Sequence, residues 1–300
     1  MRKIAALSVL LWVWLGLSSI KAESFFPDPN LDAAVRKQVF GGDKMTEDDL
    51  KKLSTIKATG AGIRDLRGLE KCTSLAALDL ADNQIADLTP LKGLTNLQTL
   101  TLSANKIQDI SPLSGLTNLQ YLELSRNEIS EISALGKLTQ LSALYLSGNG
   151  ISNINAIQNL HKLSSLYLDG NKVSDLKPLV EIRNLSSLGV SGNRVSDLTP
   201  ISNMKDLRYL SLDNNRLSDL KPLVVMSKKD FEGEKRFAPY LFLAVNGNPL
   251  SATAKTQLAE LKGYGVRLKP EEPATISHKS DAQKATAASS KKKASTQTKN

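Results

Sequence analysis

Apolar and polar positions alternate along most of the chain in a frame that repeats every 22 residues. The stretch 97–110 reads LQTLTLSANKIQDI and the stretch 119–132 reads LQYLELSRNEISEI, with leucine or isoleucine at the same places in both. An asparagine marks each unit, at Asn83, Asn105, Asn127, Asn149, Asn171, Asn193, Asn215 and, after a break in the spacing, Asn248. Such a period indicates supersecondary units that stack on one another, so we expect one elongated domain.

Each unit combines a short strand with a return segment. Leu144 and Leu146 flank Tyr145, which is the alternation of buried and exposed side chains that a strand produces. The return segment, such as 107–116, has apolar residues three apart, which favours a 3₁₀ or irregular turn. The pattern therefore predicts an α/β solenoid, a leucine-rich repeat array with short parallel strands on its concave face and 3₁₀ or irregular turns on its convex face.

Two polar columns accompany the leucines. The asparagines turn the chain inward after each strand, and we interpret them as a structural ladder whose amides satisfy buried backbone groups. The second column is acidic and consists of Asp65, Asp87, Asp109, Glu131, Asp175, Asp197 and Asp219. Stacked carboxylates are consistent with calcium binding. The glycine-rich ligand loops of calcium-binding repeats are absent from the sequence, so the pattern favours acids that cap the following turn.

The segment 23–52 lies outside the frame and is predicted to be a helical N-terminal cap. Asn30 is expected to be the N-cap of a helix that runs to about Val39, where Gly41-Gly42 follow. Thr46 is expected to start a second helix, which has three acids in its first turn.

Repeats are predicted over residues 53–250, with an insertion of 11 residues near 228–239. A C-terminal cap is expected at 251–269, with a helix at about 252–261 and a strand at 266–268. The segment 270–300 is rich in Lys, Ser, Thr and Ala and is predicted to be disordered, because it has too little apolar surface to bury.

The first 22 residues are predicted to be a secretory signal peptide. Arg2 and Lys3 precede an apolar run of 14 residues, which is short for a membrane-spanning helix. A short polar segment that ends at Ala22 follows this run. The mature protein is therefore expected to be secreted, periplasmic or exposed at the cell surface. The net charge of +9 resides mostly in this segment and in the tail, so the folded body is nearly neutral and we expect no nucleic-acid partner.

The sequence does not indicate an enzyme. Its two histidines, His161 and His278, belong to no Ser-His-Asp grouping, metal-ligand cluster or phosphate loop, so we expect no catalytic residues, metal or cofactor. Cys72 is the single cysteine and cannot form an intramolecular disulfide. It occupies an apolar column of the repeat and is interpreted as a buried core residue rather than a reactive thiol.

The motif L-x-x-L-x-x-L-x-L-x-x-N-x-I-x-x-I/L, at a strict 22 residues, resembles the bacterial internalin-type leucine-rich repeat. The segment 46–91, TEDDLKKLSTIKATGAGIRDLRGLEKCTSLAALDLADNQIADLTPL, is similar to the helical cap of that family and its first repeat. The resemblance covers about residues 24–250 and implies a right-handed, curved solenoid that binds a partner protein on its concave face. Eukaryotic phosphatase regulators share the period, but they are intracellular, which disagrees with the predicted signal peptide.

The exposed strand positions are the candidate binding site. Tyr145 and Tyr167 occupy equivalent places one repeat apart, and tyrosine with arginine is typical of the centre of protein interfaces. Tyrosine also has a high strand propensity, so the alternative is that these tyrosines have no role in binding. The predicted partner-binding residues are Tyr121, Glu123, Arg126, Tyr145, Tyr167, Asp169, Arg208, Tyr209 and Asp213. The small residues beside them indicate a shallow, even surface on the strands, which suits a protein or polysaccharide partner.

The lysine-rich tail suggests a second kind of function. Its lysines, including Lys291, Lys292 and Lys293, are suited to binding an anionic envelope polymer or lipid, or they belong to a solvated tether. We therefore expect a monomeric, non-catalytic protein that recognises a protein partner. The alternative is an envelope-associated scaffold that its basic tail retains, with the repeats mainly structural.

Overall fold

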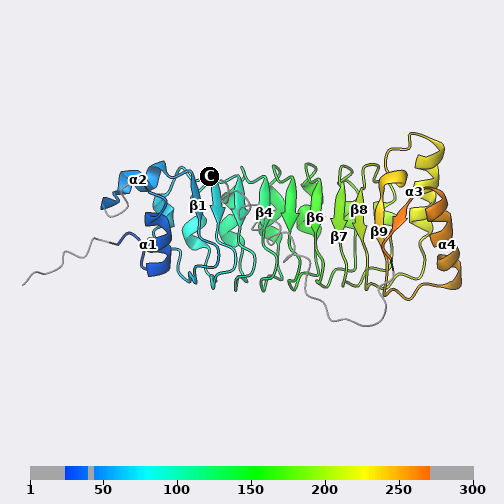
Figure 1. Cartoon of the computed structure of the whole chain (residues 1–300), viewed down its shortest axis with the longest axis horizontal. Helices are drawn as coiled ribbons and strands as arrows, with labels where there is room; N and C mark the ends of the chain where they lie inside the picture. The colour runs from blue at the N-terminus through cyan, green and yellow to red at the C-terminus, as the bar shows by residue number, and fades with distance from the viewer. Residues whose placement is uncertain (1–23, 40–43, 271–300) are drawn as a thin grey trace, which may run out of the picture. The chain divides into compact units, whose positions relative to one another are not determined.

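A computed structural model describes residues 24–39 and 44–270, so the predicted signal peptide and nearly all of the predicted tail lie outside the described residues. The chain divides into two units, Met1–Leu268 and Lys269–Asn300, and the elements below belong to the first. They form one parallel sheet with its strands in sequence order (Figure 1). The strands are β1 Thr55–Lys57, β2 Ala77–Asp79, β3 Thr99–Thr101, β4 Tyr121–Glu123, β5 Ala143–Tyr145, β6 Ser165–Tyr167, β7 Ser187–Gly189, β8 Tyr209–Ser211, β9 Phe242–Ala244 and β10 Arg267–Leu268.

Short 3₁₀ turns connect most of the strands, which confirms the predicted leucine-rich repeat solenoid. They are η2 Leu69–Lys71, η3 Thr89–Leu91, η4 Ser111–Gly115, η5 Ser133–Lys137, η6 Asn155–Asn159, η7 Lys177–Leu179 and η8 Thr199–Ile201. Prolines stand at the first turn of η3, η4, η7 and η8, where the fixed φ of proline suits a helical start.

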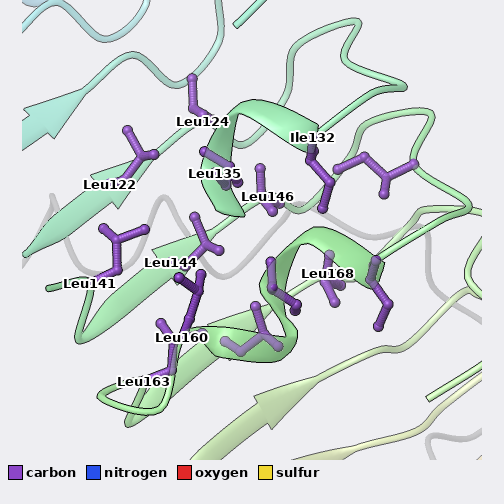
Figure 2. Packing of buried hydrophobic residues seen from close by; sticks show 14 of the residues in the cluster. Leu122, Leu124, Ile132, Leu135, Leu141, Leu144, Leu146, Leu160, Leu163 and Leu168 are labelled. Atoms are coloured by element: carbon purple, nitrogen blue, oxygen red, sulfur yellow. The ribbon is translucent and has the colours of Figure 1, made fainter. Parts of the chain in front are cut away.

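The core lies between the strands and the turns. The central leucines of neighbouring strands are register partners, such as Leu122 with Leu144, and both are fully buried. Leu135 of η5 packs from the turn side, as Figure 2 shows. Each such leucine contributes about 1.5–3 kcal/mol by its burial. Because every unit buries the same set of side chains, the period of 22 residues fixes the register of strands β1–β8.

Two helices, α1 Pro29–Arg36 and α2 Glu47–Lys52, precede the first strand. The prediction of Asn30 as the N-cap of α1 is wrong. The cap is Asp28, whose carboxylate accepts from the N–H groups of Asn30 and Leu31 and, across the chain, from those of Arg64 and Asp65. Thr46 is confirmed as the N-cap of α2, with a reciprocal capping box to Asp49.

The first edge of the sheet is also closed by this N-terminal segment. The side-chain amide of Gln38 accepts from the N–H of Lys57 at 2.9 Å and donates to its carbonyl oxygen at 3.2 Å. The amide therefore takes the place of a further strand beside β1, which protects an edge that would otherwise invite pairing with another chain.

At the other end the repeat frame changes. Helix α3, Lys221–Glu232, replaces the 3₁₀ turn and begins before the predicted insertion at 228–239, so the extra residues extend the return segment. A short turn, η9 Ala238–Tyr240, then leads into β9. Helix α4, Ala252–Gly263, and strand β10 follow, close to the segments expected to be helix and strand. Within the described residues, no helix combines the length and apolar character that crossing a membrane requires.

Candidate binding face

One surface of the sheet carries the variable side chains. The first residue of each strand, and in β1–β6 also the third, is at least partly exposed, as Tyr121 and Glu123 are on either side of the buried Leu122. We call this surface the sheet face and define it by these first and third strand residues. The backbone of every strand is hydrogen-bonded to its neighbours, so the sheet face holds its side chains at fixed spacing.

Five aromatic rings form a continuous row on the sheet face, which we call the aromatic row: Tyr121, Tyr145, Tyr167, Tyr209 and Phe242. Their successive centroids are 5.3, 5.2, 6.1 and 5.8 Å apart. Tyr145 and Tyr167 are stacked at 5° and Tyr209 and Phe242 at 7°, whereas the other two contacts are tilted. Each such contact contributes about 0.5–1.5 kcal/mol beyond area burial, so the rings hold one another in place.

The aromatic row crosses β7, a strand that has no aromatic residue. Gly189 stands there in register with Tyr167, and a Cβ atom at Gly189 would lie only 2.7 Å from a carbon of the Tyr167 ring. The same atom would collide with the carboxylate of Asp169. The missing side chain therefore gives the Tyr167 ring and the Asp169 carboxylate the space that they occupy, and Tyr167 contacts Tyr209 two strands away.

Two carboxylates border the aromatic row. Burial raises the pKa of Glu123, although hydrogen bonds from Ser125 and the charge of Arg126 oppose the shift. Burial likewise raises the pKa of Asp169, whose oxygens accept from the N–H of Ser191 at 2.8 Å and the hydroxyl of Ser147 at 3.3 Å. Burial also raises the pKa of the Tyr121 phenol to about 12, so its hydroxyl stays protonated and is a hydrogen-bond donor at neutral pH.

The remaining predicted site residues have different surroundings. Asp213 is predicted to be exposed, but its residue is only 8% exposed and its carboxylate accepts from the N–H of Asn246 at 2.7 Å. Arg126 pairs with Asp82 at 3.6 Å on the surface beside the strands. Arg208 is exposed and stacks on the ring of Tyr240, with its guanidinium carbon 4.7 Å from the ring centroid.

The asparagines beside the sheet hydrogen-bond to two repeats each. Asn127 donates to the carbonyl oxygens of Leu102 and Leu124 at 3.0 and 2.9 Å, and its own oxygen accepts from the N–H of Ile107 at 3.1 Å. The same pattern recurs from Asn83 to Asn248. Each side chain thus ties one unit to the preceding unit through groups that have no strand partner.

The acidic column lies on the far side of the repeat, at the starts of the turns. Asp87, Asp109 and Asp197 each accept from the N–H two residues later at 2.8 Å. Asn153 accepts in the same way from Asn155, so the position works with a neutral side chain. Within the described residues, no three acidic, histidine or cysteine side chains are placed to hold a metal ion.

Cys72 and His161 lie in different surroundings, one in the core and one on the surface. Cys72 is buried in the core, and burial raises the pKa of its thiol to about 12, which keeps it protonated. The exposed ring of His161 lies 3.4 Å from the carbonyl oxygen of Glu181, and His278 lies outside the described residues.

The sequence pattern missed two residues of this surface, Phe242 and Tyr240. Phe242 extends the aromatic row, and Tyr240, which is 53% exposed, lies next to Arg208. Both residues follow the insertion, where the spacing of 22 fails, and only the restored frame at Leu243 signals that Phe242 begins a strand. Gly189 ends its strand at an outward position, and the side chains of Tyr167 and Asp169 in the preceding repeat cover it.

Comparisons with known proteins agree with this repeat structure. A leucine-rich repeat family model matches residues 73–129 and 95–151, and a model of two leucine-rich repeat copies matches residues 139–181 and 183–224. Among curated proteins, no match was found.

Several solved structures are similar. Internalin C2 of Listeria monocytogenes is 32% identical with a TM-score of 0.65, and the match covers 76% of this chain and 95% of that one. Internalin F of the same species is 25% identical with a TM-score of 0.62, covering 85% and 94%. A plant peptide hormone receptor, RGFR1 in complex with RGF2, is 25% identical with a TM-score of 0.51, covering 61% and 30%. The 22-residue frame, the capped parallel sheet and these similarities together show that the chain belongs to the internalin-type leucine-rich repeat proteins.

Proposed function

We propose that this protein recognises a partner protein through the sheet face, without catalysis, and that the aromatic row is the centre of the contact. The observation that carries the proposal is the unbroken contact of five aromatic rings across the sheet face. Tyrosine is enriched at the energetic centre of interfaces, because it offers a large apolar ring and a hydroxyl group.

The repeat frame does not require these rings. Strands β2 and β3 carry Ala77 and Thr99 at the position where β4 carries Tyr121, and their central leucines are buried equally well. The solenoid therefore does not need a tyrosine at this position in order to fold, and the tyrosine changes only the surface. The large rings stand among small residues such as Ala143 and Ser165, so the sheet face offers a broad ridge that suits a macromolecule.

The class of fold supports a binding role. Leucine-rich repeat domains are common scaffolds for protein interactions, and the similar plant receptor is in complex with RGF2. The segment 1–22 supports export of the protein, to the medium, the periplasm or the cell surface. The lysine-rich tail then serves as a tether. In the competing proposal, the tail holds the protein at the cell envelope and the repeats are mainly structural.

A pull-down with the full chain, expressed in a bacterial host, tests the proposal. The bait is compared with Tyr145→Ala/Tyr167→Ala, with Tyr145→Phe/Tyr167→Phe, and with a form that ends at Lys269. We expect the alanine variant to lose a specific protein partner by at least about tenfold, because it removes the stacked pair at the middle of the row. The phenylalanine variant keeps the rings and should retain most of the binding.

A matched control changes two exposed side chains away from the sheet face, Lys172→Ala and Arg194→Ala. Thermal unfolding of each variant checks that the fold is intact. Loss of the partner from the form that ends at Lys269, with no effect of the tyrosine changes, would favour the tail-retained scaffold and contradict recognition by the sheet face.

A further inference from the structure

The aromatic row ends at an arginine. In the register of the sheet, Tyr209 pairs with Phe242, and Phe242 pairs with Arg267 of β10. Arg267 therefore occupies the place in the last strand that a sixth ring would occupy. Its backbone N–H donates to the carbonyl oxygen of Leu241 at 2.9 Å, which fixes the strand that presents it.

A second arginine lies at the same end of the sheet face. Arg208 directly precedes β8 and stacks on the ring of Tyr240, and a guanidinium nitrogen of Arg267 donates to the carbonyl oxygen of Tyr240 at 3.0 Å. One residue thus positions two guanidinium groups that are 59 positions apart in the sequence. We call Arg208, Tyr240 and Arg267 the arginine corner.

The insertion holds Tyr240 in this place. The Asp230 carboxylate at the end of α3 accepts from the N–H groups of Arg236, Phe237 and Ala238, at 2.8, 3.1 and 2.9 Å. Phe237 is 3% exposed and anchors the loop in the core. Figure 1 shows α3 and α4 beside β9, at the end of the array. The extra residues therefore have a structural role, because they deliver an exposed tyrosine to the end of the sheet face.

Among the residues that the structure describes, the arginine corner has no carboxylate partner for its positive charge. The carboxylates of Asp206 and Glu234 both pair with Arg236, at 2.6 and 3.7 Å. Over the described ranges 24–39 and 44–270, neither Arg208 nor Arg267 forms an ion pair. At the opposite end of the aromatic row stands the carboxylate of Glu123. The row thus has the Glu123 carboxylate at one end, the Asp169 carboxylate beside the Tyr167 ring near its middle, and the two guanidinium groups at the other end.

We propose that the arginine corner binds carboxylate side chains of the partner protein, and so fixes the direction in which an acidic, aromatic segment of that partner lies along the aromatic row. Planar guanidinium groups form paired hydrogen bonds with carboxylates, and a guanidinium that an aromatic ring already orients loses less freedom on binding. This inference rests on the proposed function, because it names the chemistry of the partner for the same surface.

The experiment uses a labelled random copolymer of glutamate and tyrosine as the probe, and fluorescence anisotropy with the full chain as the readout. We expect Arg208→Glu/Arg267→Glu to weaken binding by at least about tenfold, because both contacts become repulsive. The matched control, Arg194→Glu/Arg216→Glu, makes the same change in net charge at exposed sites elsewhere and should weaken binding by less than about threefold. The comparison at equal net charge removes the contribution of the lysine-rich tail.

Three results would overturn the inference: no binding of the copolymer by the unmodified chain, equal losses in the two charge-reversal variants, or a larger loss with dextran sulfate as the probe, which would assign the corner to a polysaccharide. The Tyr145→Ala/Tyr167→Ala variant separates the two claims. If it loses copolymer binding while Arg208→Glu/Arg267→Glu does not, the aromatic row recognises the partner and the arginine corner does not. If only the arginine variant loses binding, the corner stands and the aromatic row is not the centre of the contact.

Discussion

Strands β1–β3 and strands β4–β9 lie in the same sheet and bury the same frame of side chains, yet their outward surfaces differ. The first group presents small or polar residues such as Ala77 and Thr99, whereas the second presents the aromatic row. The asparagines make the same hydrogen bonds in both groups, as Asn83 and Asn127 illustrate. The solenoid therefore needs the leucines and asparagines, and it leaves the outward strand positions free for recognition.

The largest expected loss of stability comes from replacing an asparagine of the ladder, and it should be the same in strands β1–β3 and in strands β4–β9. Asn83→Ala and Asn127→Ala each leave buried backbone groups without partners, and each is expected to cost about 1–3 kcal/mol in the free energy of unfolding. Denaturant unfolding measures the cost. Asn118→Ala is the matched control, because Asn118 is exposed and its side-chain amide donates to the carbonyl oxygen of Thr95. An unchanged midpoint for Asn127→Ala would refute the structural ladder, and a cost in only one group would refute the shared frame.

A smaller loss of stability, together with weaker binding, should appear only in strands β4–β9. Gly189→Ala places a methyl group against the Tyr167 ring and the Asp169 carboxylate, and we expect a loss of about 1–2 kcal/mol together with weaker partner binding. This change disturbs the aromatic row without removing a ring. Gly93→Ala, between β2 and β3, is the control, because a Cβ there meets no atom within 4 Å. Equal stability and equal binding in both variants would show that the space at Gly189 is unimportant.

The smallest effect is a pH dependence of opposite sign for two acids. Burial raises the pKa of Glu123 above its ordinary 4.5, so its contribution to stability is present below that value and is lost as the pH rises through the raised pKa. Hydrogen bonds from Ser111 lower the pKa of Asp109 below its ordinary 3.8. Its contribution is therefore present above 3.8 and is lost as the pH falls through the lowered pKa.

Unfolding of Glu123→Gln and Asp109→Asn across acidic pH measures both effects. The first variant should lose the decline in stability that the wild type shows as the pH rises above 4.5. The second should lose part of the decline that the wild type shows as the pH falls below 3.8. A Glu123→Gln profile parallel to that of the wild type would contradict the burial of this carboxylate on the sheet face.

Particular residues show how far sequence patterns reach. The leucine frame predicted the strands, the turns and the neighbours Tyr145 and Tyr167, because strict periodicity places equivalent positions side by side. The capping residue of α1 was wrong by two positions, because Asp28 and Asn30 are both good N-caps and the choice depends on the contacts of Asp28 with Arg64 and Asp65. The exposure of Asp213 was wrong because its hydrogen bond to Asn246 crosses the insertion.

The sequence by itself determined the solenoid, since one repeating set of buried leucines and asparagines permits a single register for strands β1–β8. Only the tertiary structure decided how the rings and charges meet on the sheet face. Tyr167 reaches Tyr209 across β7 because Gly189 leaves room, and Tyr240 reaches Arg208 because Asp230 shapes the insertion. These contacts depend on side-chain volume and on a loop without periodicity. Burial of a repeating core fixes where each strand lies, but it leaves the direction of an outward side chain to its particular neighbours.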